Sequence, residues 1–331
     1  MEQRPLGTTG LMTSAIGFGT WEMSTTMYGD IDVSDASRAV NAAIDRGITL
    51  FDTAEVYGPF HSERLLAKAI GKRRDEIVLV TKVGFEYDDA RIVGTNSTHD
   101  YVVERTNTCL ERLDTDVIDL MLIHWPDHDT PMEEPMTALE KLKTEGKIRS
   151  YGVSNFNVEM MEECQRHGTL TANQVGYNLF DRRMEAEILP WCQANGVGYM
   201  AYGSLGFGLL TGAFGADVTF GENDWRRRGV AFGLPLFERE WLEKEVRVTD
   251  RLATLAAEHG RSLPQMAISW VLGNPAVSVA LVGMRNEQEL DENVAAAEWQ
   301  LPDDLRAAVD RVFTEEDVPT YVDHPQQLFP G

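Results

Sequence analysis

Short apolar runs alternate with amphipathic stretches along most of this chain. Eight such runs, rich in β-branched and other apolar residues, lie at 14–19, 48–52, 76–82, 117–124, 147–154, 170–177, 196–203 and 277–283. Their apolar positions are continuous rather than alternating, which is typical of parallel strands that are buried on both faces. The runs therefore predict a parallel β-sheet.

Amphipathic stretches with a helical period follow most of these runs, and most of them end on glycine or on a short polar linker. They lie at 35–47, 62–73, 98–113, 132–147, 157–167, 184–196 and 287–298. Ser34 and the pair Ser97–Thr98 precede two of them and are candidate N-caps. Eight strand–helix units favour an α/β fold of the closed (β/α)₈ TIM-barrel type. An open doubly wound sheet is disfavoured because no GxGxxG follows the first strand.

Three segments lie outside the eight units. Residues 5–14 predict an N-terminal β-hairpin that turns at Thr9–Gly10 and forms the floor of the barrel, and residues 301–313 predict an extra C-terminal helix. Residues 205–240 are too long for a simple connector and indicate a functional loop. Because α/β barrels of more than about 250 residues form one unit, residues 1–331 are predicted to be a single domain.

Charge and composition restrict the partners. The chain has 53 acidic and 30 basic side chains, a net charge of −23, which argues against a nucleic-acid partner. Only 7 of the 30 cations are lysines, and an acidic, lysine-poor surface predicts a salt-adapted protein. The alternative is an ordinary acidic bacterial protein with a high-GC codon bias.

The sequence also indicates a cellular compartment. No apolar run reaches the roughly 18 residues of a membrane span, and the N-terminus lacks the apolar region of a signal peptide. Cys109, Cys164 and Cys192 are odd in number and lack the spacing of metal ligands. We therefore expect free thiols in a reducing cytoplasm, no membrane association and no metal site. A metal-dependent barrel hydrolase would need a cluster of His, Asp and Glu on the strand ends.

Polar side chains at the carboxyl ends of the runs are the candidates for chemistry, because the active site of such a barrel lies at that face. Asp52 ends the second run and Tyr57 lies in the loop behind it, while Lys82 and His124 end the third and fourth. Each alone has an ordinary explanation, such as a turn former, a rim charge or a semi-buried imidazole. Together they form a proton-transfer constellation.

The four side chains support one another chemically. A phenol with a pKa of about 10 is a poor proton donor near neutrality, and a nearby ammonium group lowers that pKa. We expect Lys82 to have this effect on Tyr57, Asp52 to provide the countercharge of Lys82, and His124 to bind a substrate carbonyl. Because no side chain delivers a hydride, a nicotinamide cofactor is implied.

Longer motifs around these residues resemble those of the aldo-keto reductases. They are FDTAEVYG (51–58), VLVTKVG (78–84), LMLIHWPD (120–127), GKIRSYGVSNF (146–156), NQVGYN (173–178), YMAYGSLGFGLLTG (199–212) and LVGMRNEQELDEN (281–293). The resemblance covers nearly the whole chain and is strongest to the bacterial and archaeal branch with a long loop after strand 7. It implies a catalytic tetrad of Asp52, Tyr57, Lys82 and His124, in which the tyrosine is the general acid in reduction and the base in oxidation.

The same resemblance implies a set of cofactor contacts. The set comprises Thr20, Trp21, Ser154, Asn155, Gln174, Tyr202, Gly203, Leu205, Gly206, Gly283, Arg285, Glu289, Glu292 and Asn293. Two of its members depart from the family pattern. Gly203 stands where serine is frequent, so one phosphate contact has to come from the backbone. Glu289 stands where arginine or glutamine usually faces the 2′-phosphate, and a carboxylate there favours a ribose hydroxyl. Because Arg285 can still pair with the phosphate, we expect NADP, with NAD as the alternative.

The substrate pocket is implied by four positions: Trp21, Val56, Phe85 and Trp125. Aromatic walls suit apolar carbonyls and sugar faces, although the two tryptophans could instead be rim packing. Asp30 is a further candidate for binding hydroxyl groups. Nothing in the pattern specifies an oligomeric state.

The leading hypothesis is an NAD(P)H-dependent oxidoreductase that reduces aldehydes, ketones or aldoses to alcohols. A first alternative is an aldose or polyol dehydrogenase working in the oxidative direction. A second is a cofactor-binding regulatory subunit of a membrane channel, against which the intact tetrad argues.

Overall fold

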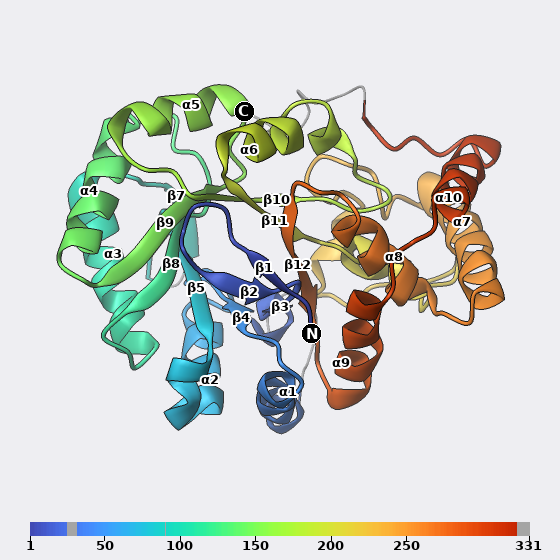
Figure 1. Ribbon diagram of the computed structural model, residues 1–331, viewed down its shortest axis with the longest axis horizontal. Helices are drawn as coiled ribbons and strands as arrows, with labels where there is room; N and C mark the ends of the chain where they lie inside the picture. Colours follow the sequence, from blue (N-terminus) through green and yellow to red (C-terminus); the bar gives the residue numbers. More distant parts are fainter. Residues whose placement is uncertain (25–31, 90, 323–331) are drawn as a thin grey trace.

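The computed structural model describes residues 1–24, 32–89 and 91–322. Eight parallel strands close into a barrel, and helices cover its outer face (Figure 1). The barrel strands are β3 (Ile16–Gly19), β4 (Leu50–Asp52), β5 (Val78–Val83), β8 (Ile118–Ile123), β9 (Ile148–Ser154), β10 (Ala172–Gly176), β11 (Gly198–Tyr202) and β12 (Val277–Gly283). Each barrel strand pairs with the next barrel strand along the chain, and β12 closes the barrel by pairing with β3. The predicted (β/α)₈ barrel is confirmed.

The barrel interior is a packed apolar core rather than a channel. Inward-facing residues of six strands fill it: Leu50, Val80, Leu120, Leu122, Ala172, Met200, Val279 and Leu281. Leu6 joins this cluster from the hairpin of β1 (Gln3–Pro5) and β2 (Met12–Ser14). A Cβ atom on Gly7, which has φ +52, would lie 2.3 Å from Gly198 N. The hairpin therefore closes the amino-terminal end of the barrel, as predicted.

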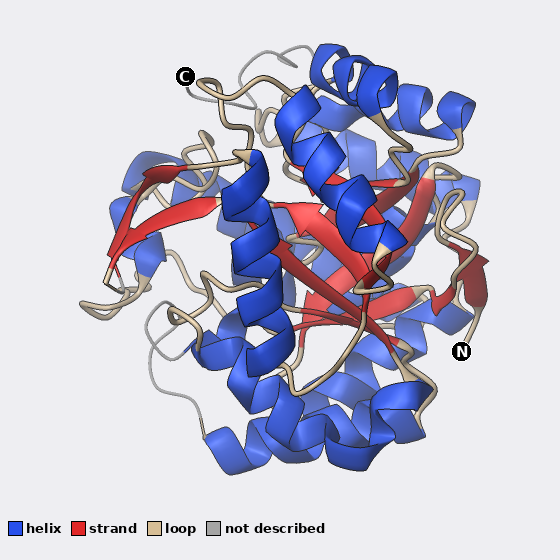
Figure 2. Cartoon of the chain, turned by 90° about the vertical axis from the view of Figure 1, so that its left-hand side faces the viewer, coloured by secondary structure: helices blue, strands red, loops and turns tan. Residues whose placement is uncertain are grey.

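The outer helices surround the strands (Figure 2), and all of them except α8 (Leu263–Leu272) correspond to predicted amphipathic stretches. They are α1 (Val33–Asp45), α2 (His61–Ile70), α3 (His99–Arg112), α4 (Glu133–Thr144), α5 (Val158–His167), α6 (Ile188–Asn195), α8 (Leu263–Leu272) and α9 (Glu287–Val294). The N-cap prediction for Ser34 is wrong. Asp32 caps α1, because its Oδ1 accepts hydrogen bonds from Ser34 N at 2.8 Å and Asp35 N at 3.1 Å. Thr98 is the N-cap residue of α3, but its side chain makes no capping hydrogen bond.

Two helices lie outside the eight strand–helix units. One is the predicted C-terminal helix, α10 (Asp303–Glu315), and the other is α7 (Arg239–Glu258), against which α10 packs. The sequence analysis did not identify α7 or α8. An antiparallel hairpin of β6 (Phe85–Asp88) and β7 (Arg91–Thr95), also not predicted, follows β5. No helix in the described part of the chain is long and apolar enough to cross a membrane.

Short 3₁₀ turns complete the secondary structure. They are η1 (Trp21–Ser24), η2 (Gly71–Glu76), η3 (Arg183–Glu185), η4 (Gly206–Thr211), η5 (Trp225–Arg228) and η6 (Ala295–Glu298). Two of them, η4 and η5, lie in the long segment after β11. This segment runs without regular strands to the start of α7 and lies over the carboxyl ends of the barrel strands. It carries several of the side chains of the cavity described next.

Candidate active site

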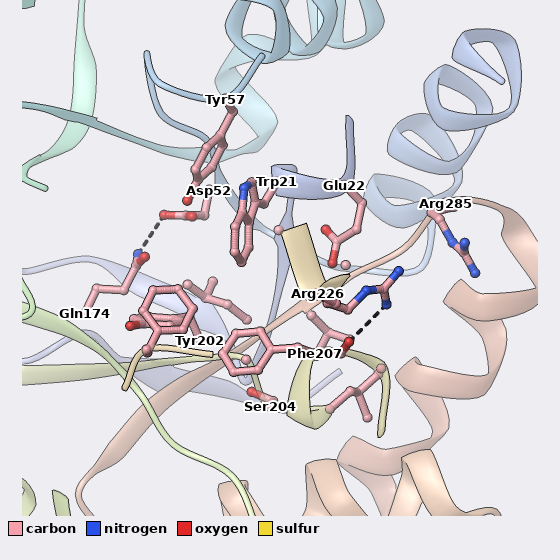
Figure 3. A pocket seen from close by; sticks show the side chains of 18 of the residues that line it. Trp21, Glu22, Asp52, Tyr57, Gln174, Tyr202, Ser204, Phe207, Arg226 and Arg285 are labelled. Atoms are coloured by element: carbon pink, nitrogen blue, oxygen red, sulfur yellow. Dashed lines mark hydrogen bonds between the residues drawn. The ribbon is translucent and has the colours of Figure 1, made fainter. Parts of the chain in front are cut away.

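Asp52, Tyr57 and Lys82 meet at the carboxyl ends of β4 and β5. Lys82 Nζ lies 2.6 Å from Asp52 Oδ1 and 3.2 Å from Tyr57 OH, and it also donates to Thr53 O at 2.9 Å. Gln174 Nε2 donates to Asp52 Oδ2 at 2.7 Å (Figure 3). Gln174, implied as a cofactor contact, lies inside β10, which continues to Gly176.

Burial and pairing act in opposite directions on the Asp52–Lys82 pair. Both side chains are almost inaccessible to solvent, with exposed fractions of 4% and 0%. Burial raises the pKa of Asp52 and lowers the pKa of Lys82, while their contact and the Gln174 hydrogen bond oppose these shifts. The Nζ group of Lys82 is thus a buried hydrogen-bond donor directly beside the Tyr57 hydroxyl.

His124 directly follows β8, the neighbour of the Lys82 strand β5, and its ring faces the ring of Tyr57. The two ring centroids are 5.9 Å apart at an interplanar angle of 80°, and the Phe85 ring lies 5.1 Å from the imidazole. Burial, reinforced by the positive charge of Lys82, lowers the pKa of His124 well below its usual value. His124 is therefore a neutral imidazole at neutral pH, suited to hydrogen bonding rather than to carrying charge.

This shift has a measurable consequence for stability. A histidine whose pKa is lowered by folding binds fewer protons in the folded than in the unfolded state. The stability that a neutral His124 allows the folded state is fully present above the unfolded pKa of about 6.5. It is lost as the pH falls toward the lowered pKa of the folded state. We expect the melting temperature of the native protein to fall more between about pH 7 and about pH 5 than that of His124→Gln. Parallel melting curves would contradict the assignment of a neutral, buried imidazole.

The loop that carries Tyr57 is anchored from below by Glu55, which is fully buried. Arg105 of α3 donates to Glu55 Oε2 at 2.9 Å, and Arg112 bonds Glu63 of α2, whose Oε1 accepts from Thr81 at 2.7 Å. These ion pairs fix the loop to the helices behind it. The acidic residue of the FDTAEVYG motif that the sequence analysis left without a role therefore positions the tyrosine.

A cavity of about 520 Å³ opens above the tetrad. Of the residues implied for cofactor and substrate, those that line it are Trp21, Val56, Phe85, Trp125, Ser154, Asn155, Gln174, Tyr202, Gly203, Leu205, Gly283, Arg285, Glu289, Glu292 and Asn293. Asp52, Tyr57 and His124 line it as well, whereas Lys82 is buried beneath them. Thr20 and Gly206 are not among the lining residues, and the Thr20 hydroxyl donates to Asp52 O at 3.0 Å. Asp30 is outside the described residues.

Next to Tyr57, a polar network surrounds the ends of β9 and β11. Tyr202 OH donates to Asn155 Oδ1 at 2.9 Å, and Asn155 Nδ2 donates to Ser154 Oγ at 3.1 Å and to His124 O at 3.2 Å. Burial raises the pKa of Tyr202, so this phenol remains a hydrogen-bond donor. Asn155 has a positive φ of +64, a conformation that asparagine tolerates better than most residues.

Among the side chains that line the cavity but were not selected by the sequence analysis are Glu22, Phe207, Arg226 and Phe232. Phe232 packs on the rings of Tyr202, Phe207 and Trp125, with centroid distances of 5.3, 5.1 and 6.3 Å. Trp21 stacks on Trp225 at 5.4 Å. The long segment after β11 thus supplies an aromatic wall of the cavity. In the sequence, only the length of this segment and its many aromatic residues indicated that it contributes to the site.

A pair of opposite charges lies at the end of the cavity where the family resemblance implies the adenosine half of the cofactor. Arg285 Nη2 lies 2.6 Å from Glu289 Oε1, and the backbone N–H of Arg285 donates to Glu289 Oε2 at 2.9 Å. Glu289 thereby partly neutralises the guanidinium that was expected to bind a 2′-phosphate. Glu289, which departs from the family pattern, is therefore in direct contact with Arg285.

With this geometry established, comparison with known proteins identifies the family. The profile of the Aldo/keto reductase family matches residues 15–313, which is most of the chain. The chain belongs to the aldo/keto reductase family. Members of the family are NAD(P)-dependent enzymes that act on carbonyl and alcohol groups, so this protein is such an oxidoreductase. The enzyme class predicted from the motifs is confirmed.

Relatives with similar sequences and structures span the whole chain. The aldo-keto reductase YhdN of Bacillus subtilis is 37% identical over 91% of this chain and 90% of its own. The structure of a glycerol dehydrogenase from Gluconobacter oxydans has a TM-score of 0.87 and 33% identity, covering 96% of each chain. An aldo/keto reductase from Klebsiella pneumoniae, in complex with NADP and acetate, has a TM-score of 0.74 and 28% identity over 95% of this chain and 96% of its own.

The cavity residues fit a nicotinamide dinucleotide at both ends. Near Tyr57, the amide of Asn155 and the hydroxyl of Ser154 match a carboxamide, and at the far end Arg285 and Asn293 offer polar groups. Gly203 has φ +63, and a Cβ atom there would lie 2.8 Å from the Phe207 ring, so only backbone lines this part of the cavity. Between the two ends lies Glu22, a carboxyl group that does not match a phosphate.

Proposed function

We propose that this enzyme reduces aldehydes, ketones or aldoses to alcohols, with Tyr57 as the general acid. The observation that carries the proposal is the position of the Tyr57 hydroxyl. It lies 3.2 Å from the buried Lys82 ammonium at the mouth of the cavity, beside a neutral imidazole. A proton donor, a group that stabilises its anion and a hydrogen-bond donor for a carbonyl oxygen are thus in one place.

Each residue then has one task in reduction. His124 donates a hydrogen bond to the substrate carbonyl oxygen, which orients and polarises the carbonyl group. Tyr57 gives its proton to that oxygen as negative charge develops, and Lys82 stabilises the resulting phenolate. Asp52 balances the charge of Lys82 and is itself held by Gln174. A bound nicotinamide supplies the hydride in reduction and accepts it in oxidation.

We propose NADP as the preferred cofactor, with NAD as the alternative. The NADP complex of the Klebsiella pneumoniae relative supports the first choice, as does the Arg285 guanidinium at the adenosine end of the cavity. Glu289 supports the alternative, because it pairs with that guanidinium and places a carboxylate where a 2′-phosphate would lie.

The preference is testable at Glu289. We expect Glu289→Gln to raise the NADPH/NADH ratio of kcat/KM, because the variant removes a repulsive charge and releases Arg285. For a partly exposed pair, a change of about 1 kcal/mol or less corresponds to about two- to fivefold. Glu287→Gln, on the same helix but paired with Arg46, is the matched control. An unchanged ratio in Glu289→Gln would place the 2′-phosphate elsewhere.

The cavity walls and the relatives are consistent with both carbonyl reduction and alcohol oxidation. Aromatic rings at Trp21, Trp125 and Phe232 suit apolar carbonyls and the apolar faces of sugars. The glycerol dehydrogenase from Gluconobacter oxydans favours a polyol as the alternative substrate, oxidised rather than reduced. Kinetics in both directions with a panel of aldehydes, ketones, aldoses and polyols distinguish these functions.

A cofactor titration by quenching of tryptophan fluorescence should precede the substrate panel. Tight cofactor binding without turnover of any carbonyl or alcohol would instead favour the regulatory-subunit alternative. We also propose a cytoplasmic location, which the three buried free thiols support. The predicted salt adaptation is tested by repeating the panel at low and molar salt.

A further inference from the structure

Glu22 lies inside the cavity at the point where β3 and β12 end. It belongs to η1, directly after the strand, and its carboxyl group rests on the backbone of Gly283, the last residue of β12. A Cβ atom built on Gly283 would lie 2.1 Å from both Cδ and Oε1 of Glu22. The carboxyl group therefore occupies the space that the missing side chain of Gly283 leaves open.

Charged groups surround this carboxyl from three other elements. Arg285 lies in the loop after β12 and Arg226 in η5 (Figure 3), and Glu289 of α9 also acts on the carboxyl electrostatically. Both arginines are also bound by other carboxylates, Arg285 by Glu289 and Arg226 by Asp224 at 2.9 Å. Desolvation of the half-buried Glu22 carboxyl raises its pKa to about 7, against the lowering effects of a backbone hydrogen bond and of the two arginines, while Glu289 raises it further.

The position matters because of what a dinucleotide would place there. Glu22 lies between Tyr57 and Arg285 along the cavity (Figure 3), and Gly283 and Leu205 also line the cavity. A dinucleotide that reaches both ends must bring its diphosphate through this middle section. An ionised Glu22 would then face a second anion inside a half-buried cavity, where like charges repel more strongly than in water.

We propose that Glu22 makes cofactor binding depend on protonation, because the dinucleotide binds preferentially when the Glu22 carboxyl is neutral. This inference rests on the proposed function, which requires a nicotinamide dinucleotide in the cavity. Binding then takes up a proton whenever Glu22 is ionised in the free enzyme. Affinity is highest at acidic pH, where Glu22 is already neutral, and decreases as the pH rises and the free enzyme becomes ionised.

The pH dependence of binding tests the proposal directly. NADH is the appropriate probe, because the 2′-phosphate of NADPH titrates near pH 6 itself and would obscure the effect. We expect quenching of tryptophan fluorescence to give about a tenfold loss of affinity for the native enzyme between about pH 6 and about pH 8, as for one ionisation in that range. Glu22→Gln should bind NADH with little pH dependence and more tightly than the native enzyme at the higher pH. Glu258→Gln, an exposed residue on α7, should behave like the native enzyme.

Calorimetry of the native enzyme alone provides a second test. Binding measured in two buffers of different ionisation enthalpy should show uptake of part of a proton near pH 7.5, and Glu22→Gln should show less. Equal pH dependence of NADH affinity in the native enzyme and Glu22→Gln would overturn the role of Glu22. So would the absence of proton uptake by the native enzyme across the same pH range. If neither NADH nor NADPH binds any variant at any pH, the proposed function fails instead.

Discussion

Tyr57→Phe is expected to lower kcat for carbonyl reduction by about 10²–10⁴-fold, the usual contribution of a positioned general acid. The substitution removes only the hydroxyl that lies 3.2 Å from Lys82 and keeps the ring that stacks on Trp21 and faces His124. Cofactor affinity should remain close to the native value, because the loss concerns an interaction made in the transition state. Steady-state kinetics and a fluorescence titration on the same sample measure both quantities.

A matched control exists on β6. Tyr87→Phe removes a phenolic hydroxyl next to Phe60 and Arg105, outside the residues that line the cavity, and should leave kcat unchanged. Near-native kcat in Tyr57→Phe would show that another group protonates the carbonyl oxygen.

The second large effect concerns the buried pair beneath the tyrosine. Asp52→Asn is expected to lower the free energy of unfolding by about 3–5 kcal/mol, because a buried ammonium loses its countercharge. Lys82 has no solvent exposure, so water cannot replace the carboxylate. Chemical denaturation measures the loss. Activity should fall as well, since an unpaired Lys82 tends to lose its proton and then stabilises the Tyr57 phenolate poorly.

The double variant Asp52→Asn/Lys82→Met separates stability from catalysis. Replacing both charges removes the unpaired ammonium, so the double variant should be more stable than Asp52→Asn alone. It should nevertheless stay inactive, because Tyr57 has lost its cationic neighbour. A double variant no more stable than Asp52→Asn would show that the carboxylate stabilises the fold through Gln174 rather than through Lys82.

The strands and the tetrad were predictable for one physical reason. In a parallel barrel all carboxyl ends lie at one face, so polar residues that follow consecutive apolar runs must converge there. Asp52, Lys82 and His124 satisfy this rule, and the structure brings them together with Tyr57. Helix caps, which depend on the local geometry of a turn, were not predictable in this way. Asp32, one residue before α1, replaces Ser34 as the cap because its carboxylate reaches two backbone N–H groups.

The features that the sequence analysis missed differ in how much signal the sequence carried for them. Helix α7 carried a readable signal, since Leu242, Val246, Thr249, Leu252 and Ala256 follow a helical period and are all buried. Glu22 carried none, because its placement depends on chain geometry in a 3₁₀ turn. For Phe232 the only signal was the length and aromatic content of its segment, which does not place a single side chain. Phe232 even has a positive φ of +49, which no apolar pattern encodes. Sequence periodicity predicts the scaffold and the residues at strand ends, but not side chains that loops deliver to the cavity.

Transfer of deuterium to an aldehyde from NADPH that carries deuterium at both hydrogens of the nicotinamide C4 tests the central claim most directly. We expect the native enzyme to place the label on the carbinol carbon of the product alcohol in a single turnover, as mass spectrometry would show. Tyr57→Phe, loaded with the same cofactor, should transfer it at least about a hundredfold more slowly. Transfer at equal rates in both proteins, or an alcohol product without the label, would contradict the account.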